Sequence, residues 1–398
     1  MPIIVHIGPP KTASTTIQKA LEFNVDNVLN ENNIQYIINS KCNNDVLFFT
    51  ANIDSPFPRE YNQPDSFKPK VYKEDAELFL KKLKKSHKKN KIYISSSEYL
   101  FRLSFEEINN LKKKLSDIDN DIEIVCFIRD PIQHNLSYMA ENIKSRISLR
   151  NPSDYINTYD QINAWEAVFG FNFHLYSFES SIKGEEGILG YFSNCINKIL
   201  IEKRIKTNIS LNSYSEIANK APCIELLKAT HQYRIKNKLE ENVYSPSLTV
   251  AKNKISKEIS KLEKSLGTKA DYSEIAKTFF INENKSLYEL LENKYDYEFN
   301  YEWKNYLDKE NYKNLRNTIW DFDNMIKSYN KDLAELFLIH LEMSTKGTNI
   351  NLPKSLMIFI RRGIKIKKKI IKIFKRFGTK NKKKVNKIFK RFGKKKKR

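Results

Sequence analysis

The sequence predicts an α/β fold in which helices flank a central parallel sheet, with a mostly helical C-terminal part and a basic amphipathic tail. Short apolar runs over residues 3–7, 91–95, 122–128 and 171–178 have the length and β-branched content of strands. Segments with helical spacing of apolar residues separate these runs, and strands that alternate with helices form parallel sheets. From about Ser210 onward the pattern is mostly helical and polar.

The first predicted strand, Ile3–Ile7, leads through a short loop into a helix over Thr15–Phe23. The third, Ile122–Ile128, is nearly all apolar, as expected for a central strand that is covered on both faces. It ends at Arg129-Asp130-Pro131, where Asp at the N-cap and Pro at the first helical position predict a helix through Lys144.

Length and composition limit the classes of protein. The chain has 398 residues, more than one core usually organises, so we expect one large domain over residues 1–345, with 209–345 as its mainly helical part, and an appendage over 346–398. Its 40% apolar content suffices for a folded core. The four cysteines show no metal-ligand spacing, and we expect neither a metal site nor a disulfide scaffold.

The net charge of +23 is concentrated at the C-terminal end. Residues 351–398 hold 22 Lys and Arg and no acidic residue, which leaves 48 basic and 47 acidic residues in the rest of the chain. Nucleic acid is therefore an unlikely partner of the main domain, because basicity there is nearly balanced.

The tail contains a repeat, since Lys372–Gly378 recurs identically as Lys387–Gly393. Apolar residues in both copies have helical spacing, with cationic residues on the other face. Three interpretations of the tail are open. It binds an anionic membrane surface as an anchor, it binds an acidic polymer such as a glycan or nucleic acid, or it is a solvated charged segment without a partner. We favour the anchor, because a solvating run needs no phenylalanine.

The start of the chain predicts a strand rather than a secretory signal, since it has no basic n-region and no cleavage pattern. No apolar run approaches the roughly 18 residues that a spanning helix needs. We therefore expect a cytoplasmic protein that is peripheral at the inner face of the membrane.

The loop between the first strand and its helix is the most informative stretch. Pro10, Lys11, Thr12, Ala13, Ser14, Thr15 and Thr16 form it together with Gly8 and Pro9. A tight loop before a helix presents unpaired backbone N–H groups and the positive end of the helix dipole. Lys11 adds a full charge and the hydroxyls add donors, so the loop is P-loop-like and suits a phosphate or phosphosulfate. It lacks the Walker pattern, and the alternative is a Pro-rich turn that caps a helix.

A second anion site is predicted after the central strand. Arg129 follows the carboxyl end of that strand, where open α/β sheets bind their ligands. Ser137 lies two turns into the next helix and can add a hydroxyl to the bidentate fork of the guanidinium. Taken alone, Arg-Asp-Pro after a strand is more typical of a helix start with a surface ion pair.

Together these motifs resemble the sulfotransferases that use 3′-phosphoadenosine-5′-phosphosulfate (PAPS). Residues 10–16 look like their 5′-phosphosulfate loop, and Ile128 through Tyr138 looks like their 3′-phosphate site. Residues 92–100, 165–170 and 173–179 resemble further segments of the bacterial, carbohydrate-type branch, and the resemblance covers roughly residues 1–300. The family usually has Gly where Ala13 stands, and its Gly-rich adenine-side segment has no counterpart here.

The resemblance implies sulfuryl transfer from PAPS, without a metal, to a hydroxyl or amine of a glycan or glycolipid. A general base must then take the proton of the acceptor. We expect Glu98 in this role, although it could instead cap a helix or pair with Arg102, and Asp45 is the second candidate. His134 is expected to be exposed.

Two other function classes remain open from the residues. A nucleotide-dependent kinase would share the scaffold, but the Gly-Lys-Ser/Thr sequence and an evident magnesium-binding Asp are missing. A polyanion-binding or nucleic-acid-binding protein that acts through the tail is indicated by net charge alone.

Overall fold

The structure is a computed structural model that describes residues 2–39, 42–52, 68–86, 91–143, 157–211, 223–239, 245–260, 271–307, 312, 322–327 and 329–345. The tail over 346–398, with its repeat, lies outside these ranges, so its predicted helices stay a prediction. So does the predicted domain boundary after residue 345.

The described residues form two compact units. The first unit comprises 1–135, 152–219 and 280–307, and the second comprises 136–151, 220–279 and 308–398. Each unit has its own apolar core.

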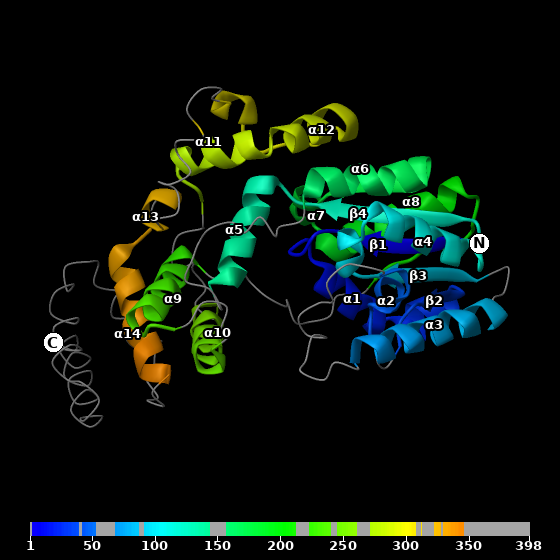
Figure 1. Cartoon of the computed structure of the whole chain (residues 1–398), viewed down its shortest axis with the longest axis horizontal. Coiled ribbons are helices and arrows are strands. Elements are labelled where there is room, and N and C mark those ends of the chain that lie inside the picture. Colours follow the sequence, from blue (N-terminus) through cyan, green and yellow to red (C-terminus); the bar gives the residue numbers. More distant parts are fainter. Residues whose placement is uncertain are drawn as a thin grey trace, which may run out of the picture. The chain divides into compact units, whose positions relative to one another are not determined.

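The first unit is built on a parallel five-stranded sheet, as the sequence predicts. Its strands are β1 (Ile3–Ile7), β2 (Ile34–Tyr36), β3 (Ile92–Ser96), β4 (Ile122–Ile128) and β5 (Phe173–Ser177). The spatial order is β2-β3-β1-β4-β5, which places β1 in the middle (Figure 1). Strand β2 has only three residues and was not expected from the sequence.

Helices cover both faces of this sheet (Figure 1). One face packs against α1 (Ser14–Phe23) and α8 (Gly187–Glu202). The other face packs against α2 (Val46–Ala51), α3 (Lys68–Ser86), α4 (Phe105–Ser116), α6 (Thr158–Phe169) and α12 (Lys285–Tyr295). All seven residues of β4 are buried, which confirms the expectation that this strand is covered on both sides.

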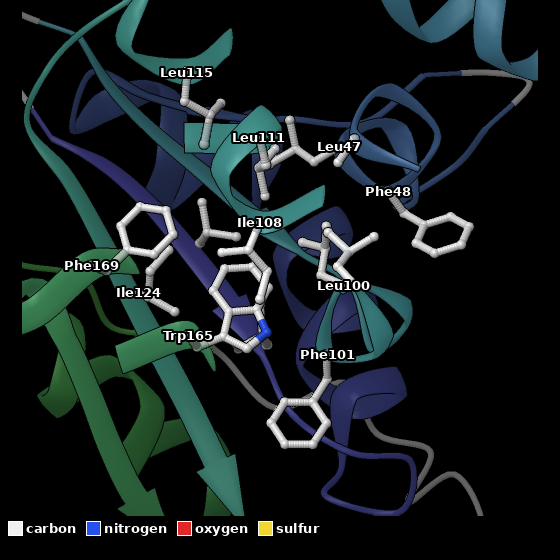
Figure 2. Packing of buried hydrophobic residues seen from close by; sticks show 14 of the residues in the cluster. Leu47, Phe48, Leu100, Phe101, Ile108, Leu111, Leu115, Ile124, Trp165 and Phe169 are labelled. Carbon is white, nitrogen blue, oxygen red and sulfur yellow. The ribbon is translucent and has the colours of Figure 1, made fainter. Parts of the chain in front are cut away.

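Apolar side chains from several of these elements meet on the second face. Figure 2 shows residues of α2, α4, α6, β4 and the 3₁₀ turn η2 (Tyr99–Arg102) gathered there. Trp165 of α6 is fully buried and stacks on Phe169, with ring centroids 5.7 Å apart. Burying such large rings contributes several kcal/mol, roughly 2 to 3 for each side chain, so this layer fixes the sheet that carries the site.

Local signals in the sequence explain where several helices begin. Ser104 and Glu107 form a capping box at α4, which satisfies two N–H groups at its start. Helix α5 (Pro131–Asn142) begins at Pro131 as predicted, and Asp130 accepts a 2.9 Å hydrogen bond from the Gln133 N–H. Lys144, the predicted end of this helix, lies outside the described ranges.

The remaining elements of the first unit are short or peripheral to the sheet. They are the π-helical turn η1 (Val25–Leu29), η3 (Gly170–Asn172), α7 (Phe178–Lys183) and η4 (Trp303–Tyr306).

The second unit is helical, as the sequence predicts for the later part of the chain. Its core is formed by α9 (Ile224–Lys236), α10 (Pro246–Ser260) and α14 (Lys331–Thr345). Helix α13 (Phe322–Met325) adds an ion pair from Asp323 to Lys228 at 2.9 Å, and α11 (Glu274–Glu283) spans the boundary between the units along the chain. Among the helices within the described ranges, none combines the length and apolar content needed to cross a bilayer.

Candidate active site

Four strands end at the same edge of the sheet, and the predicted site residues follow their ends. The register pairs His6 with Ser96, Ile7 with Cys126, and Ile128 with Ser177. The segments that leave this edge are the loop 8–16 after β1, residues 97–98 after β3, 129–130 after β4, and 178–179 after β5. Parallel strands therefore bring together residues that lie far apart in the sequence.

The loop after β1 depends on close backbone packing. A Cβ added to Gly8 would lie 2.6 Å from the carbonyl oxygen of Phe127 and 2.9 Å from the Thr12 hydroxyl, so only glycine fits there. Lys11 and Ala13 have left-handed backbone conformations, with φ of 73° and 65°. Alanine adopts this region at a cost of about 1 kcal/mol, which glycine avoids. Glycine is the residue that the resembled family usually has at position 13.

Two of the predicted hydroxyl donors are already used inside the protein. Thr12 is buried and donates to the carbonyl oxygen of Pro9 at 2.8 Å, and Ser14 donates to Oε2 of Glu98 at 2.8 Å. A hydroxyl has a single hydrogen to donate, so these two residues shape the loop and do not donate to a ligand in this arrangement. Thr15 is exposed and Thr16 is half-buried.

Glu98 contacts the loop directly. It is the residue before η2, yet its side chain makes no capping hydrogen bond, and within the described residues no ion pair joins it to Arg102. The Arg102 guanidinium instead lies 5.4 Å from the ring centroid of Tyr99. The carboxylate of Glu98 is half-buried and accepts a hydrogen bond from Ser14. Within the described residues it therefore neither caps a helix nor pairs with Arg102.

Asp45 occupies a different position. It precedes α2, is buried, and accepts a short hydrogen bond from the Ser97 hydroxyl. Both candidate bases thus accept a hydrogen bond from a serine hydroxyl. The serine that donates to Glu98 belongs to the loop after β1, whereas the serine that donates to Asp45 follows β3.

Arg129 brings a cation to the same loop. Its Nη1 donates to the backbone oxygen of Lys11 at 3.4 Å, and its guanidinium lies 5.0 Å from the ring centroid of Phe178. The Nε atom lies 3.6 Å from Oε1 of Glu179 and, although buried, makes no hydrogen bond to any described residue. Burial lowers the pKa of Arg129 from its ordinary value, while the carboxylates of Glu179 and Asp130 act in the opposite direction.

Two carboxylates lie beside Arg129. The Asp130 N–H donates to Oε2 of Glu179 at 3.0 Å, and both carboxyl groups are buried. Burial raises the pKa of Asp130 to about 6, and the nearby charge of Glu179 adds to this effect. Hydrogen bonds from Gln133 and Tyr301 oppose the rise.

His134 was expected to be exposed, and this prediction is wrong. The residue is half-buried, and its Nε2 donates to the carbonyl oxygen of Pro10 at 2.8 Å. Its pKa is lowered to about 4, mainly by burial and also by the charges of Arg129 and Lys11, while the hydrogen bond to Pro10 acts in the opposite direction. His134 is therefore neutral, and its hydrogen bond to Pro10 connects the start of α5 to the loop.

The other predicted residues are placed as follows. His6 is a core histidine, as expected: its Nδ1 lies 2.8 Å from the Ser96 hydroxyl, and burial lowers its pKa to about 3. Ser137 lies on α5 in the part that belongs to the second unit, so its role beside Arg129 stays a prediction.

Sequence reasoning missed the groups that surround Arg129, which are Glu179, Tyr297 and Tyr301. One signal was present, because Glu179 follows the end of β5 just as Arg129 follows β4. The tyrosines carry no comparable signal.

No protein-family model matches the chain, and no curated protein shows significant similarity to it. Within the described part of the chain, no group of three or more His, Cys, Asp or Glu residues is arranged to hold a metal ion.

Proposed function

We propose that this protein is a P-loop-like sulfotransferase that transfers a sulfuryl group from PAPS to a hydroxyl, or an amine, of a glycan or glycolipid. The contact between Arg129 and the backbone of Lys11 carries the proposal. It joins the loop after β1 to the cation after β4, and Glu98 contacts the same loop through Ser14. The loop after β1, the guanidinium of Arg129 and the carboxylate of Glu98 therefore lie along one edge of the sheet.

Each group fits one part of such a donor. Lys11, the backbone N–H groups of the loop and the hydroxyls of Thr15 and Thr16 suit the 5′-phosphosulfate end. Pro10, Thr12, Ala13 and Ser14 shape that loop. Arg129 suits the 3′-phosphate, because a guanidinium can donate two parallel hydrogen bonds to a phosphate and its Nη1 already contacts the loop.

The donor, when bound, supplies an activated sulfur whose bond to the 5′-phosphate oxygen breaks as the bond to the acceptor oxygen forms. Glu98 takes the proton of the acceptor hydroxyl, as a general base next to the loop. Lys11 stabilises the negative charge that develops on the departing phosphate oxygen. No protein-bound metal is part of this proposal, since these cationic and N–H groups supply the charge stabilisation.

The tail extends the proposal to the location of the protein. Residues 351–398 would bind the anionic inner face of the cytoplasmic membrane through Lys and Arg, with Ile and Phe entering the headgroup region. Co-sedimentation of the full chain with vesicles of anionic lipid, and its absence with neutral vesicles, tests this step.

Donor binding is tested by thermal shift with adenosine 3′,5′-bisphosphate and, separately, with ATP and magnesium. We expect stabilisation by the bisphosphate, loss of this effect in Arg129→Ala, and retention in the control Arg204→Ala, whose side chain is exposed. A preference for ATP with magnesium supports the kinase alternative. If removing residues 351–398 abolishes all ligand binding, the polyanion-binding alternative gains support instead.

A further inference from the structure

Two carboxylates lie close to the guanidinium of Arg129. Asp130 and Glu179, here called the carboxylate pair, both lie beside it, with Oε1 of Glu179 at 3.6 Å from Nε of Arg129. With both members ionised, the three side chains sum to one negative charge. An anion that binds to Arg129 must approach that charge.

Tyrosines of residues 280–307 hold the carboxylate pair in place. Tyr297 donates to Oε2 of Glu179, and Tyr301 donates to Oδ2 of Asp130 at 2.9 Å. The hydroxyl of Tyr288 lies 2.6 Å from that of Tyr301, and either can be the donor. Every carboxylate oxygen of the pair therefore has a partner. In Glu179, Oε1 lies near Arg129, and Oε2 accepts from the Asp130 N–H and from Tyr297. In Asp130, Oδ1 accepts from the Gln133 N–H and Oδ2 accepts from Tyr301.

We propose that Glu179 positions Arg129 for an anionic group and that anion binding at Arg129 is coupled to protonation of the neighbouring Asp130. Glu179 is a positioning residue in this proposal, since it acts through Arg129, and Asp130 acts through its charge. The proposal rests on the proposed function only in taking Arg129 as an anion contact.

The hydrogen-bond network accepts this proton without moving heavy atoms. A proton on Oδ2 of Asp130 donates to the Tyr301 oxygen, and the Tyr301 hydroxyl then donates to Tyr288. Oδ1 continues to accept from the Gln133 N–H, so α5 keeps its cap. Asparagine at position 130 can make the same bonds through its amide, and Asp130→Asn therefore mimics the protonated state.

One histidine and three tyrosines near Asp130 and Arg129 do not titrate between pH 5 and 8. His134 has a pKa lowered to about 4 by burial, so it stays neutral. Burial raises the pKa values of Tyr288, Tyr297 and Tyr301 above their ordinary range, so they stay protonated. Asp130, with its pKa raised to about 6, changes charge in this range.

The size of the effect follows from removing one negative charge near the anion. For charges about one Debye length apart (roughly 8 Å), an effective dielectric constant of about 20 and screening by salt give an affinity change of about tenfold. Since Asp130 is partly protonated at pH 5.5, we expect about five- to tenfold tighter binding at pH 5.5 than at pH 7.5.

Inorganic sulfate is the probe, because its charge does not change over this range. Its dissociation constant is measured on the full chain by calorimetry at pH 5.5 and 7.5. We expect the five- to tenfold difference in the unmodified protein and none in Asp130→Asn, which should bind at both pH values with the low-pH affinity. Tyr301→Phe removes a hydrogen bond that favours the carboxylate, so the midpoint of its profile should move to higher pH.

Glu123→Gln is the matched control, since this buried carboxylate near the start of β4 pairs with His174 and Lys203 and should leave the profile unchanged. The proposal is overturned if Asp130→Asn keeps the pH dependence, if the unmodified protein shows none, or if sulfate does not bind at either pH. Failure of adenosine 3′,5′-bisphosphate to bind, together with the expected sulfate profile, overturns the proposed function alone.

Discussion

The buried carboxyl of Asp130 predicts an unusual dependence of stability on pH. Its pKa is raised from its ordinary value to about 6 by burial, so between pH 4 and 6 the folded state binds this proton more readily than the unfolded chain. The contribution of Asp130 to stability therefore falls as the pH rises through this range and is constant above it. Asp130→Asn removes the titration while it keeps the cap of α5 and the bond to Tyr301.

The magnitude follows from the two pKa values. With an unfolded value of 3.8 and a folded value of about 6, the contribution of Asp130 to the free energy of unfolding falls by about 2 kcal/mol between pH 4.5 and 7.5. The stability of Asp130→Asn relative to the unmodified protein should rise by that amount over the same interval.

Urea unfolding followed by tryptophan fluorescence measures this difference, because Trp165 and Trp303 are buried in the first unit. Asp323→Asn is the control: hydrogen bonds from Tyr329 and Lys228 lower the pKa of Asp323, so its difference profile should be small and of opposite sign. A difference profile for Asp130→Asn that is flat from pH 4.5 to 7.5 would contradict the reasoning.

Two further predictions concern the backbone of the loop after β1. Gly8→Ala should destabilise the protein by about 3 kcal/mol, because its Cβ would overlap the Phe127 carbonyl, whereas Gly184→Ala should be nearly neutral, since nothing lies within 4 Å. A small loss for Gly8→Ala would contradict the packing described. Ala13→Gly should stabilise the protein by about 0.5 kcal/mol, because glycine adopts a φ of 65° without strain. Ala20→Gly, at a position inside α1, should instead destabilise it by about 1 kcal/mol. Denaturant midpoints test the two glycine variants and the two alanine variants.

The sequence was sufficient to predict the parallel sheet, because its central strands are continuous apolar runs. Strands β1 and β4 have the predicted bounds, and β3 and β5 differ from theirs by one to two residues. Strand β2 was missed, since three residues are too few for a pattern to emerge. The sequence also predicted that the loop, Arg129 and Glu98 follow strand ends, and the structure places them there.

The surroundings of these residues could not be predicted, since they depend on contacts between distant segments. Tyr297 contacts Glu179 across 118 positions, and Tyr301 contacts Asp130 across 171. Whether His134 is exposed was likewise decided by the packing of α5 against Pro10, which no local periodicity encodes.

The measurement that tests the account most directly is the binding of adenosine 3′,5′-bisphosphate to the full chain, without metal, followed by calorimetry. The account predicts saturable binding that Arg129→Ala weakens by at least tenfold, as expected when a charged hydrogen bond of about 1.5 to 3 kcal/mol is lost. Binding that is equally tight in Arg129→Ala would contradict the assignment of Arg129, and binding of ATP with magnesium in place of the bisphosphate would contradict sulfuryl transfer.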